Sequence, residues 1–261
     1  MNNNVNVISL FDGISCGRLA FERAGIKVNS YYAFEIDKYA KAISRYNYPD
    51  IKQCGDVLET NFRKFSDIDF VIGGSPCTFW SIAKNNREID KSGMGWELFM
   101  RFAETVKTIK PKYFLYENVA SMPKNIKEYI TEELGVEPIF INSALVSAQQ
   151  RKRLYCTNIK NVVQPDDKKI FLKDILESGI TPLDKSSCID ACYYKDGNHS
   201  SPNKQSGKRR MVCEPIMLDE KSIGAALRTR KDETGKFKRL EVRKDNKLNS
   251  LTTVLTDSMI C

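Results

Sequence analysis

The chain has 261 residues, of which 41% are hydrophobic and 28% are charged, enough to bury the core of one large α/β domain with a smaller region attached. It has no run of about 18 apolar residues that could cross a bilayer, and its first residues lack the basic start of a signal peptide, so we expect a cytoplasmic protein and no membrane. Lys and Arg number 41 against 33 Asp and Glu, and the net charge of +8 favours a polyanionic partner.

The first part of the chain alternates between strand and helix patterns. Short apolar, β-branched runs occupy residues 5–11, 30–34, 68–74 and 112–119, and helical patterns begin near 18, 37 and 96. Gly25 is suited to end the first helix, and Asp37 is suited to cap the start of the second. This alternation predicts an α/β fold, with a parallel sheet and crossover helices on both faces.

The character of the chain changes after two further strand patterns, at 138–146 and 153–159. From about residue 160 to 238 the sequence is polar and rich in Lys, Asp, Ser and Gly, and regular patterning fades. We therefore expect a domain of residues 1–159 and a smaller irregular region of residues 160–261.

A glycine turn and two acidic residues indicate a cofactor site. Gly13 and Gly17 follow the first strand, where the backbone has to turn tightly and approach a ligand at the start of a helix. Glu35 ends the next strand, where a carboxylate can accept hydrogen bonds from both hydroxyls of a ribose. Asp56 lies in a turn at the expected end of the third strand and suits an adenine amino group. The F-x-G-x-x-x-G spacing differs from that of nicotinamide sites, so the pattern favours another adenosine-containing cofactor.

One of the eight cysteines has the position of a nucleophile. Cys77 follows a strand directly, at the sheet edge where ligands of open α/β folds bind, whereas a structural cysteine would usually lie inside the strand. Glu117 ends a neighbouring strand and could supply an acid, with Asn118 holding the loop. Arg151 and Arg153 are two positions apart and could bind a ring oxygen or a phosphate. A solvated charge run is the ordinary alternative for that basic segment.

In chain order, these motifs resemble those of cytosine carbon-5 DNA methyltransferases. FDGISCG resembles the family's first motif, Glu35 the second, Asp56 the third, GGSPC the catalytic fourth, ENV the sixth and QQRKR the eighth. The resemblance covers residues 5 to about 158. The serine of GGSPC is closer to the de novo and phage-like branches than to the usual proline-proline-cysteine form. The resemblance implies a Rossmann-like methyltransferase sheet with a smaller target-recognition region.

The resemblance also implies an activity: methylation of cytosine carbon 5 within a specific sequence of double-stranded DNA, in restriction-modification or phage self-protection. Cys77 would attack carbon 6 of a flipped base, Glu117 would grip the ring, and Arg151 and Arg153 would assist. S-adenosylmethionine would be the methyl donor and S-adenosylhomocysteine the product. The implied donor site comprises Phe11, Asp12, Gly13, Gly17, Glu35, Ile36, Asp56, Val57, Pro76 and Leu98.

Further polar residues are candidates for DNA or metal contacts. Residues 78–95 would form a mobile catalytic loop, with phosphate contacts from Ser81, Lys84, Asn85, Asn86 and Arg87. In the recognition region the candidates for DNA contact are Lys208, Arg209, Arg210, Arg228, Arg230, Lys238, Arg239 and Arg243. A zinc site could be assembled from Cys188, Cys192, His199 and Cys213. Because no second tight pair accompanies the only histidine, we expect no metal.

Members of this family continue into a ninth and a tenth motif. The last segment, KLNSLTTVLTDSMIC, resembles the stretch before the ninth motif, so we expect ~50 to 80 residues to be lacking. Truncation, completion by a second polypeptide and decay to a DNA-binding protein are the alternatives. Intact chemical residues favour the first two, and we expect the isolated chain to bind S-adenosylmethionine weakly. Two other functions stay open: cytosine methylation of transfer RNA, and a catalytically silent DNA-binding subunit.

Overall fold

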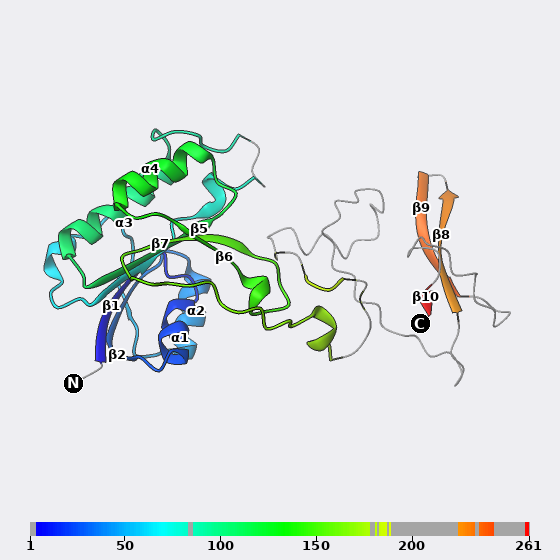
Figure 1. Ribbon diagram of the computed structural model, residues 1–261, viewed down its shortest axis with the longest axis horizontal. Coiled ribbons are helices and arrows are strands. Elements are labelled where there is room, and N and C mark those ends of the chain that lie inside the picture. Colours follow the sequence, from blue (N-terminus) through cyan, green and yellow to red (C-terminus); the bar gives the residue numbers. More distant parts are fainter. Residues whose placement is uncertain are drawn as a thin grey trace. The chain divides into compact units, whose positions relative to one another are not determined.

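The structure is a computed structural model (Figure 1). It describes residues 4–82, 86–177, 181, 183–186 and 188, and the backbone of 224–232, 235–242 and 259–260. The chain forms two compact units, one of residues 1–142 and 152–164, the other of residues 143–151 and 165–261. The functional boundary that we predict after residue 159 stays a prediction.

A seven-stranded mixed sheet forms the centre of the first unit, in the order β3-β2-β1-β4-β5-β7-β6. Its strands are β1 (Asn4–Leu10), β2 (Lys27–Phe34), β3 (Lys52–Gln53), β4 (Phe70–Gly73), β5 (Tyr113–Val119), β6 (Ile139–Asn142) and β7 (Lys152–Thr157). The first five of these strands pair in parallel. Their carboxyl ends therefore meet at one edge of the sheet, where ligands bind in open α/β folds.

The last strand in the chain order of this sheet, β7, is antiparallel to its neighbours, and the sequence predicts no direction for it. β7 is antiparallel to both β5 and β6, so the parallel arrangement predicted from the alternating first part of the chain is confirmed for the first five strands, and β7, predicted only as a strand, runs in the opposite direction. The connection between β6 and β7, residues 143–151, contains only the short 3₁₀ helix η3 (Ser143–Leu145). Such a connection is shorter than the crossover of a dozen or more residues that a parallel pair needs.

Helices cover both faces of the sheet, as predicted. Figure 1 shows α1 (Cys16–Arg23) and α2 (Lys38–Asn47) on one side, and α3 (Met94–Ile109) and α4 (Lys124–Leu134) on the other. The alternating side chains of the strands form two cores accordingly: Val7 belongs to a cluster with Phe21 of α1, whereas Ile8 belongs to a cluster with Phe99 of α3. Within the described ranges, no helix is long and apolar enough to cross a membrane.

Local sequence signals set most of the helix ends. Asp37 caps α2, as predicted, and its side chain accepts hydrogen bonds from two backbone N–H groups at 2.9 and 2.7 Å. Gly25 adopts a φ of 70° just after α1, a backbone conformation that favours glycine. α4 was not predicted. It follows Pro123 and has no side-chain hydrogen bond at its N-terminus, so it lacks the signal that identifies α2.

A three-stranded antiparallel sheet lies in the second unit, in the order β10-β8-β9. Its strands are β8 (Gly224–Asp232), β9 (Gly235–Val242) and β10 (Met259–Ile260). Asp232 pairs with Gly235, so β8 and β9 form a tight hairpin. The region that we expected to be irregular therefore contains regular structure. Charged residues at consecutive positions of RTRKD and KFKR obscure the period of two that marks a strand.

Candidate active site

The chemistry-bearing residues of the sequence gather at the carboxyl edge of the parallel strands. Phe11 follows β1, Glu35 follows β2, and Asp56 lies shortly after β3. Cys77 lies shortly after β4, and Glu117 lies near the end of β5. Neighbouring parallel strands bring these five segments to the same edge, although they are far apart in the sequence.

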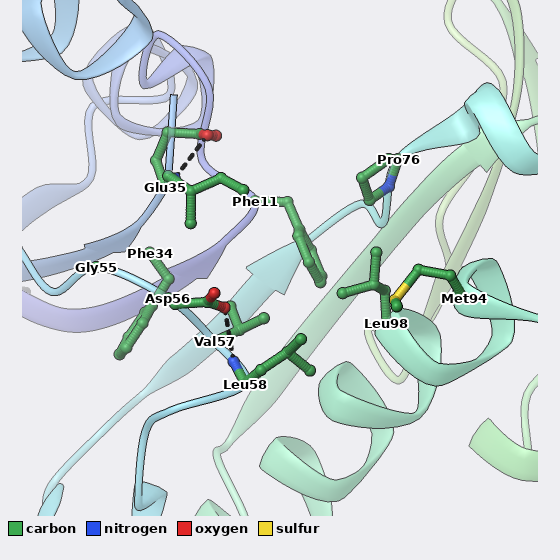
Figure 2. A pocket seen from close by; sticks show the side chains of 11 residues that line it. Phe11, Phe34, Glu35, Gly55, Asp56, Val57, Leu58, Pro76, Met94 and Leu98 are labelled. Carbon is green, nitrogen blue, oxygen red and sulfur yellow. Dashed lines mark hydrogen bonds between the residues drawn. The ribbon is translucent and has the colours of Figure 1, made fainter. Parts of the chain in front are cut away.

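A pocket of about 300 Å³ opens at this edge (Figure 2). Its walls are mostly apolar, with two carboxylates. The lining residues are Phe11, Phe34, Glu35, Ile36, Gly55, Asp56, Val57, Leu58, Pro76, Met94 and Leu98. In Figure 2 the ring of Phe11 lies between the side of Asp56 and Val57 and the side of Leu98. Most residues predicted for a cofactor site therefore line this pocket; the exceptions are Asp12, Gly13 and Gly17.

Two of these exceptions are glycines with structural roles, one in the turn after β1 and one within α1. Gly13 has a φ of 60°, and its N–H donates to Oε2 of Glu35 at 2.8 Å. Gly17 lies within α1, where a Cβ would come within 2.5 Å of Ile72 Cδ1 and 2.9 Å of Tyr31 Oη. Gly13 thus holds a pocket residue, and Gly17 allows α1 to pack closely on the sheet.

Asp12, the third exception, belongs to a buried polar network. Its carboxylate accepts hydrogen bonds from the hydroxyl of Tyr31 at 2.7 Å and from the hydroxyl of Ser15. Burial raises the pKa of Asp12 above its ordinary value of 3.8, and the hydroxyl donors offset only part of this effect. Burial also raises the pKa of Tyr31. These groups hold the turn that carries Phe11 and Gly13 without lining the pocket.

The two pocket carboxylates are held by backbone N–H groups. Glu35 accepts from Gly13 through Oε2, and from Ile36 and Asp37 through Oε1, each at 2.8 Å. Asp56 accepts from the N–H of Leu58 through Oδ1 at 2.8 Å. Its Oδ2 has no hydrogen-bond partner in the described part of the chain, so one acceptor remains for a ligand donor.

Four lining residues were not predicted: Phe34, Gly55, Leu58 and Met94. Phe34 precedes Glu35, and Gly55 precedes Asp56. Met94 lies four positions before Leu98 in α3, which places both on one helix face. The signal that could have identified them is therefore adjacency along a strand end or a helix face.

Cys77 lies next to the pocket along the chain. It begins the 3₁₀ helix η2 (Cys77–Phe79), directly after the pocket residue Pro76, and it is half-buried. Its carbonyl accepts hydrogen bonds from the N–H groups of Trp80 at 3.1 Å and Ser81 at 2.9 Å. The start of the loop is thus a defined turn around the candidate nucleophile.

Two features hold the segment before Cys77 against the end of β5. A Cβ on Gly74 would lie 2.6 Å from the carbonyl oxygen of Glu117 and 3.1 Å from its Oε2. Only a residue without a side chain permits this approach. Asn118 donates through Nδ2 to the carbonyl oxygen of Ser75 at 3.0 Å, so it holds the loop as predicted.

The serine of GGSPC takes part in a buried hydrogen-bond network. Its Oγ lies 2.7 Å from Tyr116 Oη, and Asn118 Nδ2 donates to the same phenol oxygen at 2.9 Å. Burial raises the pKa of Tyr116, which keeps the phenol protonated and able to donate to Ser75. This network fixes Ser75 two positions before Cys77.

Glu117 forms an ion pair with Arg153. The distance from Arg153 Nε to Glu117 Oε1 is 2.7 Å, with side chains 12% and 36% exposed. In the antiparallel pairing of β5 and β7, Arg153 stands opposite Val119 and Glu117 opposite Tyr155, so the ion pair is a diagonal cross-strand contact. Oε1 is thereby occupied, while Oε2 lies on the side of Gly74.

The other predicted arginine belongs to the second compact unit. Arg151 donates through Nη1 to Cys188 Sγ at 3.4 Å. Cys188 is the one candidate zinc ligand that the structure describes; Cys192, His199 and Cys213 lie outside the described residues. In the described part of the chain, no group of three or more His, Cys, Asp or Glu is arranged to hold a metal.

The predicted DNA contacts are described in part. Arg87 donates to the carbonyl oxygen of Ser121 at 2.9 Å, and Ser81 and Asn86 are also among the described residues. Arg228, Arg230, Lys238 and Arg239 lie on β8 and β9, which are described by their backbone. The candidates outside the described residues are Lys84, Asn85, Lys208, Arg209, Arg210 and Arg243.

The family to which this site belongs is decided by a comparison of the whole sequence. The model of the C-5 cytosine-specific DNA methylase family matches residues 5–253. The chain belongs to this family. The resemblance drawn from the six motifs is thereby confirmed. C-5 cytosine-specific DNA methylases act on DNA and take their methyl group from S-adenosylmethionine.

Similar members of this family come from phages and bacteria. The orphan methyltransferase M.SPRI of Bacillus phage SPR is 28% identical over 190 residues, which are 67% of this chain and 43% of the relative. The type II methyltransferase M1.ScrFI of Lactococcus lactis subsp. cremoris is 30% identical over 229 residues, 77% and 56% of the two chains. M.NgoPII of Neisseria gonorrhoeae, also type II, is 30% identical over 197 residues, 67% and 57%. The chain thus spans about half the length of these methylases.

Proposed function

We propose that this chain transfers a methyl group from S-adenosylmethionine to carbon 5 of cytosine in a specific sequence of duplex DNA. The observation that carries the proposal is the packing of Gly74 against Glu117, because it holds the segment of Cys77 and the pocket residue Pro76 beside a carboxylate. A nucleophile, an acid and a cofactor pocket then share one edge of the sheet.

The pocket has the groups that an adenosine-containing cofactor requires. The unpartnered Oδ2 of Asp56 can accept from the adenine amino group, and Glu35 can accept from ribose hydroxyls. Phe11 and Leu98 supply apolar walls for the adenine ring. S-adenosylmethionine supplies an electrophilic methyl group when bound. The remaining lining residues, Ile36, Val57 and Pro76 among them, complete the proposed donor site.

Cys77 is the proposed nucleophile. Its thiolate would form a bond to carbon 6 of cytosine, and the electron pair of the 5,6 double bond would make carbon 5 nucleophilic. Carbon 5 would take the methyl group as the bond between that methyl and the sulfonium sulfur breaks, with S-adenosylhomocysteine as the leaving group. A base then removes the proton from carbon 5, the carbon–sulfur bond breaks, and the thiolate is regenerated. A stacked base cannot be reached in this way, so the proposal includes flipping of the cytosine out of the duplex.

Glu117 is the proposed acid toward ring nitrogen 3, where negative charge develops during thiolate addition. Arg153 occupies Oε1 of Glu117. This leaves Oε2, on the side of the Cys77 segment, as the atom that contacts the ring. Arg153 thus orients the carboxyl group, and Arg151 is proposed to contact the base or a phosphate.

A mechanism-based adduct tests this function. The chain is incubated with S-adenosylmethionine and duplex DNA that contains 5-fluorocytosine, where fluorine blocks the final elimination and traps the enzyme. We expect a denaturation-resistant adduct that Cys77→Ser abolishes and that Cys16→Ser, at an exposed cysteine, leaves intact. Adduct on 5-fluorocytosine transfer RNA alone would instead favour RNA methylation. No adduct on either nucleic acid would favour a silent DNA-binding subunit.

The biological setting is part of the proposal. Relatives from Bacillus phage SPR and from bacteria support a role in restriction-modification or phage self-protection, in the cytoplasm of a bacterium. The prediction of a second polypeptide is tested in the same assay. A candidate chain added to the reaction would raise the adduct yield if it completes the site.

A further inference from the structure

Asp56 belongs to a loop without regular structure, and this loop forms one wall of the pocket. Residues 54–61 connect β3 to the 3₁₀ helix η1 (Phe62–Lys64), and four of them, Gly55 to Leu58, line the pocket. Within the loop, Asp56 Oδ1 accepts from the N–H of Leu58 at 2.8 Å, and Thr60 Oγ1 donates to the carbonyl of Asp56 at 2.9 Å. These bonds shape the loop, but both partners of each bond belong to it.

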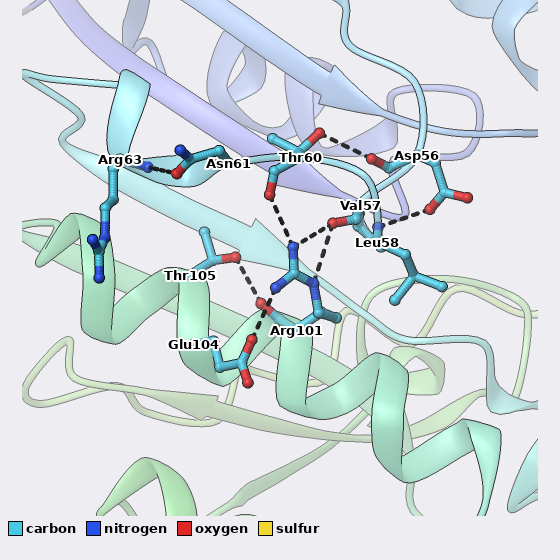
Figure 3. A network of polar contacts seen from close by, with 9 residues as sticks. All are labelled: Asp56, Val57, Leu58, Thr60, Asn61, Arg63, Arg101, Glu104 and Thr105. Atoms are coloured by element: carbon cyan, nitrogen blue, oxygen red, sulfur yellow. Dashed lines mark hydrogen bonds and ion pairs between the residues drawn. The ribbon is translucent and has the colours of Figure 1, made fainter.

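Arg101 of α3 ties this loop to the rest of the fold. Its Nε and Nη2 donate to the carbonyl oxygen of Val57 at 3.2 and 2.8 Å, and Nη2 also donates to the carbonyl oxygen of Thr60 at 2.9 Å. Figure 3 shows the guanidinium between these two backbone carbonyls, with Nη1 directed to Glu104 at 2.9 Å. The guanidinium carbon also lies 5.5 Å from the ring centre of Phe62.

The same helix carries the opposite wall of the pocket. Leu98 lies three positions before Arg101, and Met94 lies one turn earlier. The guanidinium therefore links the two walls: α3 forms one of them and binds the backbone of the other. Hydrogen bonds from a charged donor are stronger than neutral ones, and the Arg101 side chain is only 23% exposed, so water competes weakly for the two carbonyls.

We propose that Arg101 is a positioning residue for the methyl-donor site. It is not among the lining residues and does not touch the cofactor; it fixes the separation between the Gly55–Leu58 wall and α3, and so the position of Asp56 Oδ2. The inference rests on the proposed function, because it takes the pocket to be the S-adenosylmethionine site. The planar guanidinium of arginine donates hydrogen bonds to both carbonyl oxygens at once. The ammonium of lysine is a compact point charge without this planar fork of donors.

Four variants distinguish the positioning role of Arg101 from its ion pair with Glu104. Arg101→Met removes all bonds to the loop, and Arg101→Lys keeps a charge that can reach one carbonyl. Glu104→Gln removes only the ion pair, an i,i+3 contact to a half-exposed carboxylate that contributes little to stability. Arg63→Met is the matched charge control. Arg63 lies beside the loop, and in Figure 3 its side chain extends away from the Arg101 network.

The measurement is the dissociation constant of S-adenosylhomocysteine, determined by titration calorimetry, with urea unfolding of each variant as the folding control. We expect Arg101→Met to weaken binding about tenfold or more and Arg101→Lys to give an intermediate value. Glu104→Gln and Arg63→Met should stay within about twofold of the parent chain. In steady state, Arg101→Met should raise KM for S-adenosylmethionine with kcat unchanged at saturation, whereas a general folding defect would lower kcat in proportion to the folded fraction.

The outcomes distinguish the two proposals. If the parent chain binds S-adenosylhomocysteine and Arg101→Met binds it equally well, the positioning role is overturned and the proposed function stands. If the parent chain does not bind it even in the presence of a candidate second polypeptide, both are overturned. If Arg101→Met fails to fold, Arg101→Lys decides the question, and affinity equal to that of the parent chain overturns the role.

Discussion

At the scale of single residues, the site depends on a glycine, Gly74, that lies against the end of β5. Gly74 lies so close to Glu117 that a Cβ would collide with its carbonyl oxygen at 2.6 Å. We predict that Gly74→Ala slows adduct formation at Cys77 on the order of a hundredfold, because a displacement of about 1 Å at a reacting group has that effect. The rate is measured with 5-fluorocytosine DNA, and circular dichroism checks the fold.

Gly135→Ala is the control for this prediction. Gly135 ends α4 with a φ of 65°, and a Cβ there would meet nothing within 4 Å. Alanine should therefore destabilise the chain by about 1 kcal/mol through backbone strain and leave the adduct rate unchanged. A Gly74→Ala protein that reacts at the parent rate would show that the close approach has no role in catalysis.

The ion pair between Glu117 and Arg153 leads to a second prediction. We expect Glu117→Gln and Arg153→Met each to slow adduct formation by about 10²-fold or more, since the first removes the acid and the second its orientation. The double variant should be no slower than the worse single variant, because Arg153 acts through Glu117. Additive effects in this double-mutant cycle would mean that Arg153 acts separately.

Asp12 predicts a pH dependence of stability. Burial raises its pKa in the folded chain above the ordinary 3.8, so the folded state holds a proton that the unfolded state releases. The contribution of Asp12 to stability is therefore complete below pH 3.8 and is lost as the pH rises through its raised pKa. The Asp12→Asn variant has no carboxyl group to titrate and should not lose stability in this way. Its free energy of unfolding in urea, relative to that of the parent chain, should therefore rise as the pH increases from 3.8 through the raised pKa of Asp12.

Asp90 provides a control of opposite sign. Hydrogen bonds from the hydroxyl and the N–H of Ser92 lower the pKa of this exposed carboxyl group. Its contribution to stability is present above the ordinary pKa of 3.8 and is lost as the pH falls through the lowered value. Asp90→Asn should lose stability relative to the parent chain at neutral pH and not at low pH. Equal pH profiles for both variants would contradict the assignment to Asp12.

Sequence reasoning at this scale succeeds for residues within motifs and fails for those that act through long-range contacts. Cys77, Glu117 and Asp56 are predicted as candidates because each follows or ends a strand. Arg101 carries no such signal: its partners Val57 and Thr60 are more than 40 positions away. Only the folded chain reveals that the helix and the loop are bonded.

At the scale of elements, the start of α3 is held by a residue outside the helix. Glu88 Oε2 accepts from the N–H of Gly95 at 2.9 Å, and a Cβ on Gly93 or Gly95 would come within 2.6 Å of the Glu88 carboxylate. Two glycines therefore make room for a carboxylate over the helix N-terminus, where negative charge is favourable. This bond fastens the second half of the loop after Cys77 to the helix that carries Met94 and Leu98.

We predict that Glu88→Ala, which removes the acceptor of the Gly95 N–H, increases amide hydrogen exchange in residues 87–95 and lowers stability by about 1 kcal/mol, the usual effect of losing a helix cap. Glu97→Ala is the matched control, since this exposed glutamate lies in the first turn of the same helix without a bond to Gly95. Equal exchange in both variants would assign the effect to the helix dipole alone.

Strand and helix identities are predictable where the signal is local. The turn after β1, the Asp37 cap and the strands β4 and β5 follow from short patterns. β7 is recognisable as a strand, but its antiparallel direction follows from the length of a connection whose end was not apparent in the sequence. α4 begins without a capping side chain. In β8 and β9, consecutive charged residues obscure the alternation of apolar and polar residues that identifies a strand.

At the scale of the whole molecule, sheet topology locates the candidate site, whereas net charge indicates only the kind of partner. The topology places the candidate site at one edge of five parallel strands, as an alternating sequence predicts. The charge of +8 supports attraction to DNA but identifies no contact. We predict that affinity for non-specific duplex DNA falls by on the order of 10³-fold between about 50 and 200 mM salt, as counterion release requires. Fluorescence anisotropy measures it, and a salt-independent affinity would contradict it.

The path of the chain between its two compact units limits how the second unit could be exchanged for that of a relative. The second unit takes its residues from two stretches, 143–151 and 165–261, separated by the segment that supplies β7 and Arg153. A chimaera made by a single junction after β7 would leave residues 143–151 of the original chain in place. On the proposal that the target-recognition region lies in the second unit, grafting a new sequence preference requires both stretches to be exchanged together, with the arginine strand between them retained.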